Sequence, residues 1–129
     1  MSRLLLDACT FVWLNSNIER IPRRVQELCA DQDNRIYLSS VTAWEITAKH
    51  HAGRLLLPEP AQEFITNGRA ASGTISLRLR EEDVFQLAKL PPIHRDPFDR
   101  MLICQAISRG LAILTPDSHI RQYPVATIW

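Results

Sequence analysis

A chain of 129 residues is long enough for one hydrophobic core and too short for two, so we expect a single domain over residues 1–129. Its content of 46% apolar and 22% charged residues argues against general disorder. The net charge of +1 excludes attraction of nucleic acid by bulk charge, so such a partner would need a local patch or a metal ion.

Apolar runs alternate with helical patterns along the chain. The run over residues 3–7 is rich in leucine and lacks polar alternation, which is typical of a strand covered on both faces. The elements predicted after it are a helix from residue 9 or 10 to 14, a helix from 22, a strand over 36–39 with a helix after it, a helix over 60–71, a strand over 74–77, a helix from 80 that ends before 91, a helix over 96–109, and strands over 111–114 and 125–128. This alternation predicts a three-layer α/β/α sandwich around a five-stranded parallel sheet.

Two expectations concern the core. In the helix from residue 80 the side chains expected to face inward are Val84, Leu87 and Ala88, and the acids at 81–83 favour the helix N-terminus rather than a site. Aromatic rings can stack on bases, but large aromatics in a domain of this size are usually buried. We therefore interpret three residues as core: Trp13, Trp44 and Trp129.

Cysteine usage and the amino-terminal run indicate the compartment. The three cysteines, Cys9, Cys29 and Cys104, form an odd number without a C-x-x-C pair, which favours reduced thiols over a disulfide framework or a zinc ribbon. Asp7 interrupts the apolar run of Leu4–Leu6 after a length far too short for a signal peptide or a membrane span. We expect a cytoplasmic protein with no membrane segment.

Four acids lie where predicted strands end or helices begin. Asp7 follows the first strand, Glu45 lies in the helix after the second, Asp99 lies in the first turn of the helix over 96–109, and Asp117 follows the strand over 111–114. The carboxyl ends of parallel strands meet at the edge of the sheet where ligands bind, so these acids should converge. Converging carboxylates repel one another unless their pKa values rise or a cation is held between them.

The most densely charged stretch is His94-Arg95-Asp96-Pro97-Phe98-Asp99-Arg100. Asp96 is a good N-cap, Pro97 suits the first helical position, and Asp99 meets the positive end of the helix. From this segment alone, a capped helix and part of an active site are equally good explanations. The other three acids favour the active site, with Asp96 interpreted as the helix cap rather than as a ligand.

A local explanation also exists for Glu45. Thr42-Ala43-Trp44-Glu45 fits a capping box, in which the glutamate would serve only the helix start. Lys49 lies four residues beyond Glu45, and the simplest explanation of that spacing is an ordinary contact on a helix surface.

Five blocks, taken together, match a known family. They are Leu4-Leu5-Leu6-Asp7, then Trp44-Glu45-Ile46 with Lys49 and Gly53-Arg54-Leu55, then His94 to Arg100, then Leu114-Thr115-Pro116-Asp117, and the final Trp129. In this order and spacing they resemble a PIN domain, and in particular the VapC-type toxins of bacterial toxin–antitoxin pairs. The likeness extends over nearly the whole chain.

The resemblance implies a function and a site. The family's fold is an α/β/α sandwich, and the family's activity is metal-dependent cleavage of RNA, commonly structured RNA such as tRNA. By this likeness Asp7, Glu45, Asp99 and Asp117 form the acidic metal site, and Asp96 is an extra acid beside it. A cognate antitoxin protein is the implied partner, and such domains often form a homodimer. Ala8 and Cys9 stand where many members have a hydroxyl residue, which removes one possible donor to Asp7.

Oxygen ligands suit Mg²⁺ or Mn²⁺ better than zinc. We expect Asp7 and Asp99 to be the most direct ligands, with Glu45 orienting water or binding through it and Asp117 completing the shell. Further candidates are Thr115 and Lys49 from the matching blocks, together with Arg95 and Arg100, which could contact RNA phosphates or simply neutralise neighbouring carboxylates. His94 is a possible proton donor or RNA contact, although a lone histidine is more often structural.

Two other functions remain open at this point. A catalytically silent PIN-like module could bind RNA or a protein through the same cleft, although such a module has no reason to keep four acids. A metal phosphohydrolase acting on DNA or a small phosphate ester would share the ligands and differ only in its substrate.

Overall fold

The computed structural model describes all 129 residues. The strands are β1 (Arg3–Leu6), β2 (Arg35–Ser39), β3 (Ile75–Leu77), β4 (Ala112–Leu114) and β5 (Thr127–Ile128). The helices are α1 (Ala8–Ser16), α2 (Arg23–Ala30), α3 (Ser40–His51), α4 (Ala61–Ser72), α5 (Glu81–Phe85) and α6 (Pro97–Arg109), with short 3-10 turns η1 (Ile18–Arg20), η2 (Gln86–Lys89) and η3 (Ile120–Gln122). None of the helices combines the length and the apolar composition that crossing a bilayer requires.

All five strands pair in parallel in the order β3-β2-β1-β4-β5. The chain builds outward from β1 through β2 to β3, and then returns to the other side of β1 to add β4 and β5. The order of strands therefore reverses between β1 and β4, and the carboxyl ends at such a reversal form the usual ligand crevice of an open α/β sheet.

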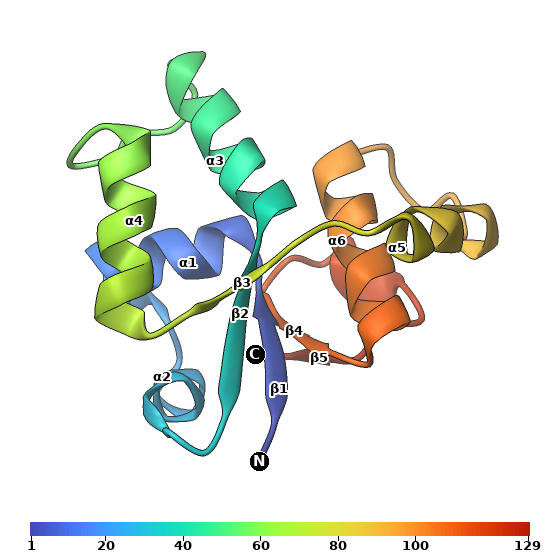
Figure 1. Cartoon of the computed structure of the whole chain (residues 1–129), viewed down its shortest axis with the longest axis horizontal. Helices are drawn as coiled ribbons and strands as arrows, with labels where there is room; N and C mark the ends of the chain where they lie inside the picture. The colour runs from blue at the N-terminus through green and yellow to red at the C-terminus, as the bar shows by residue number, and fades with distance from the viewer.

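Helices cover both faces of the sheet, which confirms the predicted three-layer sandwich (Figure 1). One face packs through Leu4, Leu6 and Leu38 against α1, α2, α3 and α4, whereas Leu5 and Ile113 point to the other face, which α6 covers with η2 and η3. Successive residues of β1 enter opposite cores because side chains of a strand alternate between its faces. This explains why β1 contains leucine without polar alternation.

The local signals at α6 predicted its structure closely. Asp96 Oδ1 accepts hydrogen bonds from the backbone N–H groups of Phe98 and Asp99, and Pro97 is the first helical residue. The helix ends at Gly110, whose φ of 67° is a left-handed conformation that favours glycine. The predicted cap, first residue and end of this helix are therefore confirmed.

One local alternative is excluded, and two local predictions are wrong. The helix after β2 begins at Ser40, with the Ser39 hydroxyl accepting from the N–H of Val41, so Glu45 lies in its middle and forms no capping box with Thr42. Leu87 and Ala88 are exposed because α5 stops at Phe85 and a 3-10 turn redirects the chain. Trp44 is not a core residue, since 64% of it is exposed.

A buried ion pair joins α5 to α6. Arg109 Nε and Nη2 donate to the two carboxylate oxygens of Asp83 at 3.2 and 3.1 Å, and Asp83 is fully buried. The second Asp83 oxygen also accepts from the N–H of Arg80, so this acid serves the start of α5, as its position predicted.

Candidate active site

The four predicted acids lie around one cavity at the carboxyl edge of the sheet. Asp7 follows β1, Glu45 lies in α3, Asp99 is the third residue of α6, and Asp117 follows β4. The cavity has a volume of about 250 Å³, and its walls also include Asp96 and Lys49, together with Ala8, Cys9, Val12, Trp13, Ile46 and Leu55. Five carboxylates and a single cationic side chain therefore share one small space.

Asp7 is the most deeply placed of these acids, with 5% of its surface exposed. Its Oδ1 accepts from the N–H of Thr10 at 2.9 Å, which makes it the N-cap of α1, and Oδ2 accepts from the Thr115 hydroxyl. The Cys9 thiol lies 3.4 Å from Oδ1 and donates to it. Burial nevertheless raises the pKa of Asp7, and these hydrogen bonds only partly oppose it.

The donors to Asp7 correct one expectation. Ala8 carries no hydroxyl, but the Thr115 hydroxyl and the Cys9 thiol donate to the Asp7 carboxylate in its place. The strand register explains the first contact: Leu6 pairs with Leu114, so the residues that follow, Asp7 and Thr115, emerge side by side. This juxtaposition could have been derived from the sequence had the order of the strands been known.

Glu45 is 6% exposed and reaches the cavity from α3. Lys49 Nζ lies 2.5 Å from Glu45 Oε2, one helical turn away. Burial raises the pKa of Glu45 and Asp99 raises it further, whereas the hydrogen bond and the charge of Lys49 lower it.

Asp99 is held by His94, for which the sequence offered a proton donor, an RNA contact or a structural residue but not this contact. His94 Nε2 lies 3.0 Å from Asp99 Oδ2, and His94 Nδ1 lies 2.8 Å from the Tyr123 hydroxyl. Burial lowers the pKa of His94, but its bonds to Asp99 and Tyr123 outweigh this and raise it. Burial also raises the pKa of Asp99, with contributions from Asp96 and Asp117.

Asp117 is tied to its own loop. Its Oδ1 accepts from the N–H groups of His119 and Ile120 at 2.7 and 3.2 Å, and its own N–H donates to Thr115 Oγ1 at 3.0 Å. His119 stacks on His94 with 5.1 Å between ring centroids and 4° between ring planes. The loop carrying Asp117 therefore packs on the segment that precedes Asp99.

The structure separates the two arginines of the charged stretch. Arg100 Nη1 donates to the carbonyl of Pro91 at 2.9 Å and to the Tyr123 hydroxyl at 3.0 Å, so it fixes the loop before α6. Arg95 is exposed and lies beside the cavity without lining it. Asp96 lines the cavity while it caps α6.

The acidic residues that line the cavity all offer carboxylate oxygens, which are the ligands that a hard divalent cation prefers. No group of three or more histidine, cysteine, aspartate or glutamate side chains is, however, arranged in this structure to hold a metal ion. Each acid is instead bonded to a protein donor: Thr115 for Asp7, Lys49 for Glu45, His94 for Asp99 and a backbone N–H for Asp117.

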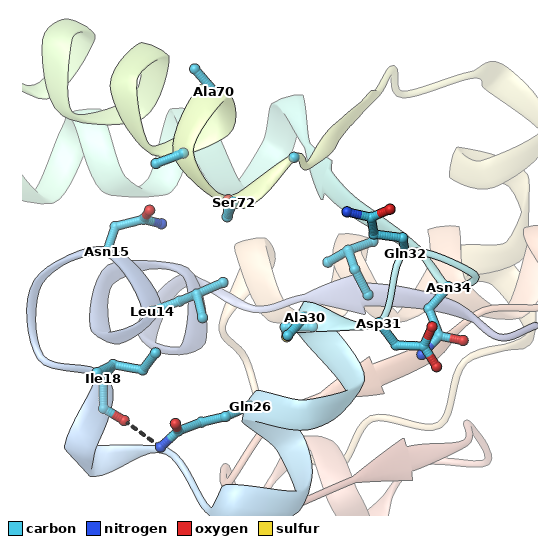
Figure 2. Close-up of a pocket in the computed structure, with 14 residues that line it drawn as sticks. Leu14, Asn15, Ile18, Gln26, Ala30, Asp31, Gln32, Asn34, Ala70 and Ser72 are labelled. Atoms are coloured by element: carbon cyan, nitrogen blue, oxygen red, sulfur yellow. Dashed lines mark hydrogen bonds between the residues drawn. The ribbon is translucent and has the colours of Figure 1, made fainter.

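A larger cavity of about 600 Å³ lies at the opposite edge of the sheet, near the start of β2 (Figure 2). Most of its walls are aliphatic groups and uncharged amides, and several of the amides are already bonded within the protein. Gln26 Nε2 donates to the carbonyl of Ile18 (Figure 2), and Asn15 Nδ2 donates to that of Phe11. This cavity does not gather the ionisable groups that the acidic cavity does.

The fold and the acidic crevice together define an α/β/α protein whose polar site lies at the switch point of a parallel sheet. The chain belongs to the PIN domain family, whose model matches residues 4–126. PIN domains are generally nucleases and typically use divalent metal ions.

Solved structures support the fold. VapBC2 from Rickettsia felis bound to a DNA fragment from its promoter superposes with a TM-score of 0.74 at 14% identity, covering 98% of each chain. DNA-bound VapBC from Salmonella typhimurium gives 0.71 at 20% identity, covering 99% of this chain and 98% of the other. FitAcB from Neisseria gonorrhoeae gives 0.62 at 18% identity, covering 98% and 96%. No curated protein matches the chain.

Proposed function

We propose that this chain is a metal-dependent endoribonuclease, the toxin of a toxin–antitoxin pair, that cleaves structured RNA such as tRNA. The observation that carries the proposal is the convergence of Asp7, Glu45, Asp99 and Asp117 from four separate elements on one cavity of a PIN domain. Asp7 and Glu45 are buried, and burial raises the pKa values of Asp7, Glu45 and Asp99; such perturbed carboxylates in a cavity are common at functional sites.

Asp7 and Asp99 would hold Mg²⁺ or Mn²⁺ most directly, with Glu45 and Asp117 completing the shell. A bound ion of this kind would polarise the scissile phosphate and lower the pKa of an attacking water. Thr115 and Cys9 orient Asp7, and His94 orients Asp99, as donors beside metal ligands usually do. Arg95 is free to contact an RNA phosphate, whereas Arg100 holds the loop.

The proposed partners are based on the sequence resemblance, and several of the similar structures being VapBC complexes supports the antitoxin. We propose a cognate antitoxin protein as the regulator of this chain, and a homodimer, checked by sedimentation, as its assembly. We further propose that residues 1–129 act as one domain and that the protein works in the cytoplasm, where its RNA substrate is found.

The test is incubation of the purified, partner-free protein with total structured RNA in Mg²⁺ or Mn²⁺, with parallel arms containing EDTA or the Asp99→Asn variant. Discrete fragments that are absent from both control arms are expected. Parallel assays with duplex DNA and with a small phosphodiester separate a ribonuclease from a general phosphohydrolase. Full metal-dependent cleavage by Asp99→Asn would show that the residue assignment is wrong.

One observation favours a second candidate, a catalytically silent module that binds RNA or a protein through the same cavity. No group of three or more potential ligands is arranged to hold a metal ion in this structure. For such a module we expect no rise in thermal stability with Mn²⁺ and unchanged RNA binding in EDTA, whereas the nuclease is stabilised by any ion that binds only its folded state.

A further inference from the structure

We infer that Lys49 is an internal counter-cation of the cavity. Its ammonium group is bonded to the Glu45 carboxylate, and this bond must break before Glu45 can take part in metal binding. Lys49 would thereby set the metal affinity of the site. This inference rests on the proposed function, since it concerns the same cavity.

The first support is the geometry of the pair. Lys49 Nζ lies 2.5 Å from Glu45 Oε2, and the two residues are one turn apart on the same side of α3. The Glu45 side chain is 8% exposed, compared with 35% for Lys49, so the carboxylate is buried while the ammonium can still reach solvent. Lys49 can therefore move without uncovering the core.

The second support is the charge of the surroundings. Lys49 is the only cationic side chain among the residues that line the cavity, against the five acids Asp7, Glu45, Asp96, Asp99 and Asp117. Burial disfavours the charge on Lys49, but Glu45, Asp96 and Asp99 together raise its pKa, so the ammonium form prevails. Arg100, the residue after Asp99, is bonded to Pro91 and Tyr123 instead.

An ordinary surface pair would not have these properties, and the chain contains one for comparison. Arg23 Nε and Glu27 Oε1 are 3.5 Å apart at the same spacing on α2, but their side chains are 91% and 71% exposed. Solvent screens such a pair almost completely. The Lys49–Glu45 pair differs because it lies in the wall of an acidic cavity, where an ammonium and a dication would compete for the same oxygen.

The experiment is a calorimetric titration of metal-free protein with Mn²⁺ alone. Lys49→Gln removes the charge with little change in size, and Lys49→Arg retains the charge. Arg23→Gln makes the same change in net charge at the exposed pair. We expect Lys49→Gln to bind Mn²⁺ about tenfold more tightly than wild type, because a unit charge beside the ion is worth at least that much. Lys49→Arg and Arg23→Gln should match wild type within a factor of about two.

A second readout excludes a merely structural role. In EDTA the melting temperature of Lys49→Gln should fall, since Glu45 loses its partner, and Mn²⁺ should raise it by more than in wild type. In a Glu45→Gln background, Lys49→Gln should tighten Mn²⁺ binding by a clearly smaller factor, because the competition for the Glu45 oxygen is gone and only the charge of Lys49 remains.

The outcomes separate this inference from the proposed function. If wild type binds Mn²⁺ and Lys49→Gln binds it equally or more weakly, the inference about Lys49 is wrong and the metal site stands. If neither protein binds Mn²⁺, and Asp7→Asn behaves identically to wild type, both the inference and the proposed metal site are wrong.

Discussion

The Thr115 hydroxyl donates a hydrogen bond to the carboxylate of Asp7, although the two residues are 108 positions apart in the chain. The contact exists because β1 and β4 are parallel neighbours, and their last residues, Leu6 and Leu114, are paired. The next residue of each segment, Asp7 after β1 and Thr115 after β4, therefore lies beside the other. The most buried acid of the cavity is thus positioned by the sheet itself.

Replacement of Thr115 by valine should therefore destabilise the protein. The change removes a donor to a buried carboxylate and leaves the N–H of Asp117 without its Thr115 acceptor. We expect a loss of about 1–3 kcal/mol in the free energy of unfolding. Urea denaturation at pH 7 in EDTA measures it, with Thr115→Ser as the control that keeps the hydroxyl. Equal stability of Thr115→Val and wild type would contradict this role.

The raised pKa of Asp7 predicts an unusual pH dependence. Burial raises this pKa above the ordinary value of 3.8, so the folded protein retains a proton that the unfolded chain has already lost. The resulting stabilisation is complete below pH 3.8 and is lost as the pH rises through the folded-state pKa. Metal-free wild type should therefore lose stability relative to Asp7→Asn as the pH rises from about 4 to 8.

Urea denaturation of both proteins in EDTA at several pH values gives that difference directly. Comparing the two proteins cancels the titration of other groups, such as Asp83, whose pKa is lowered because its bonds to Arg109 and Arg80 outweigh its burial. A difference that does not change with pH would mean that Asp7 titrates normally in the folded protein.

The Asp83–Arg109 pair should contribute to stability without affecting the cavity. Arg109→Met leaves the Asp83 carboxylate buried without its charged partner, which should cost about 3 kcal/mol. Breaking the exposed Arg23–Glu27 pair should cost less than about 1 kcal/mol. Thermal or urea unfolding compares the two variants. Nuclease activity per folded molecule should stay at the wild-type level in both, since neither pair lines the cavity.

Tyr123 predicts a change that NMR can follow. Its hydroxyl contacts His94 Nδ1 at 2.8 Å and Arg100 Nη1 at 3.0 Å, and its ring is buried. Tyr123→Phe should lower the pKa of His94, because the bond to this hydroxyl helps to raise it. A pH titration of the His94 ring signals in wild type and in Tyr123→Phe measures the shift. An unchanged or higher His94 pKa would show that Asp99 alone governs it.

Sequence patterns predicted those parts of the fold that depend on neighbouring residues in the chain. The uninterrupted leucines of β1 indicated a strand buried on both faces, and Asp96, Pro97 and Gly110 marked both ends of α6. The predicted ends of the elements were less accurate. The strand predicted over 125–128 covers only Thr127–Ile128, and the helix predicted to end at residue 14 continues to Ser16. Such ends depend on pairing and packing with distant segments, which local patterns do not contain.

The convergence of the four acids on one cavity was predictable from the sequence, but their supporting contacts were not. Asp7 and Asp117 could be placed because both follow apolar runs that end at one sheet edge. The contacts of His94 with Asp99 and of Thr115 with Asp7 require knowledge of how loops and strands meet. Trp44 was misplaced because the prediction rested on the general burial of large aromatics, whereas its exposure and its T-shaped contact with Phe98 of α6 are tertiary features.

The central claim, that these acids form one metal site, is tested most directly by anomalous diffraction from crystals grown with Mn²⁺. We predict a peak in the acidic cavity at about 2.1 Å from carboxylate oxygens of both Asp7 and Asp99. The Glu45 carboxylate should then be turned away from Lys49 Nζ relative to the present 2.5 Å contact. A cavity without a peak at saturating Mn²⁺, with the four acids still bonded to their protein donors, would contradict the account.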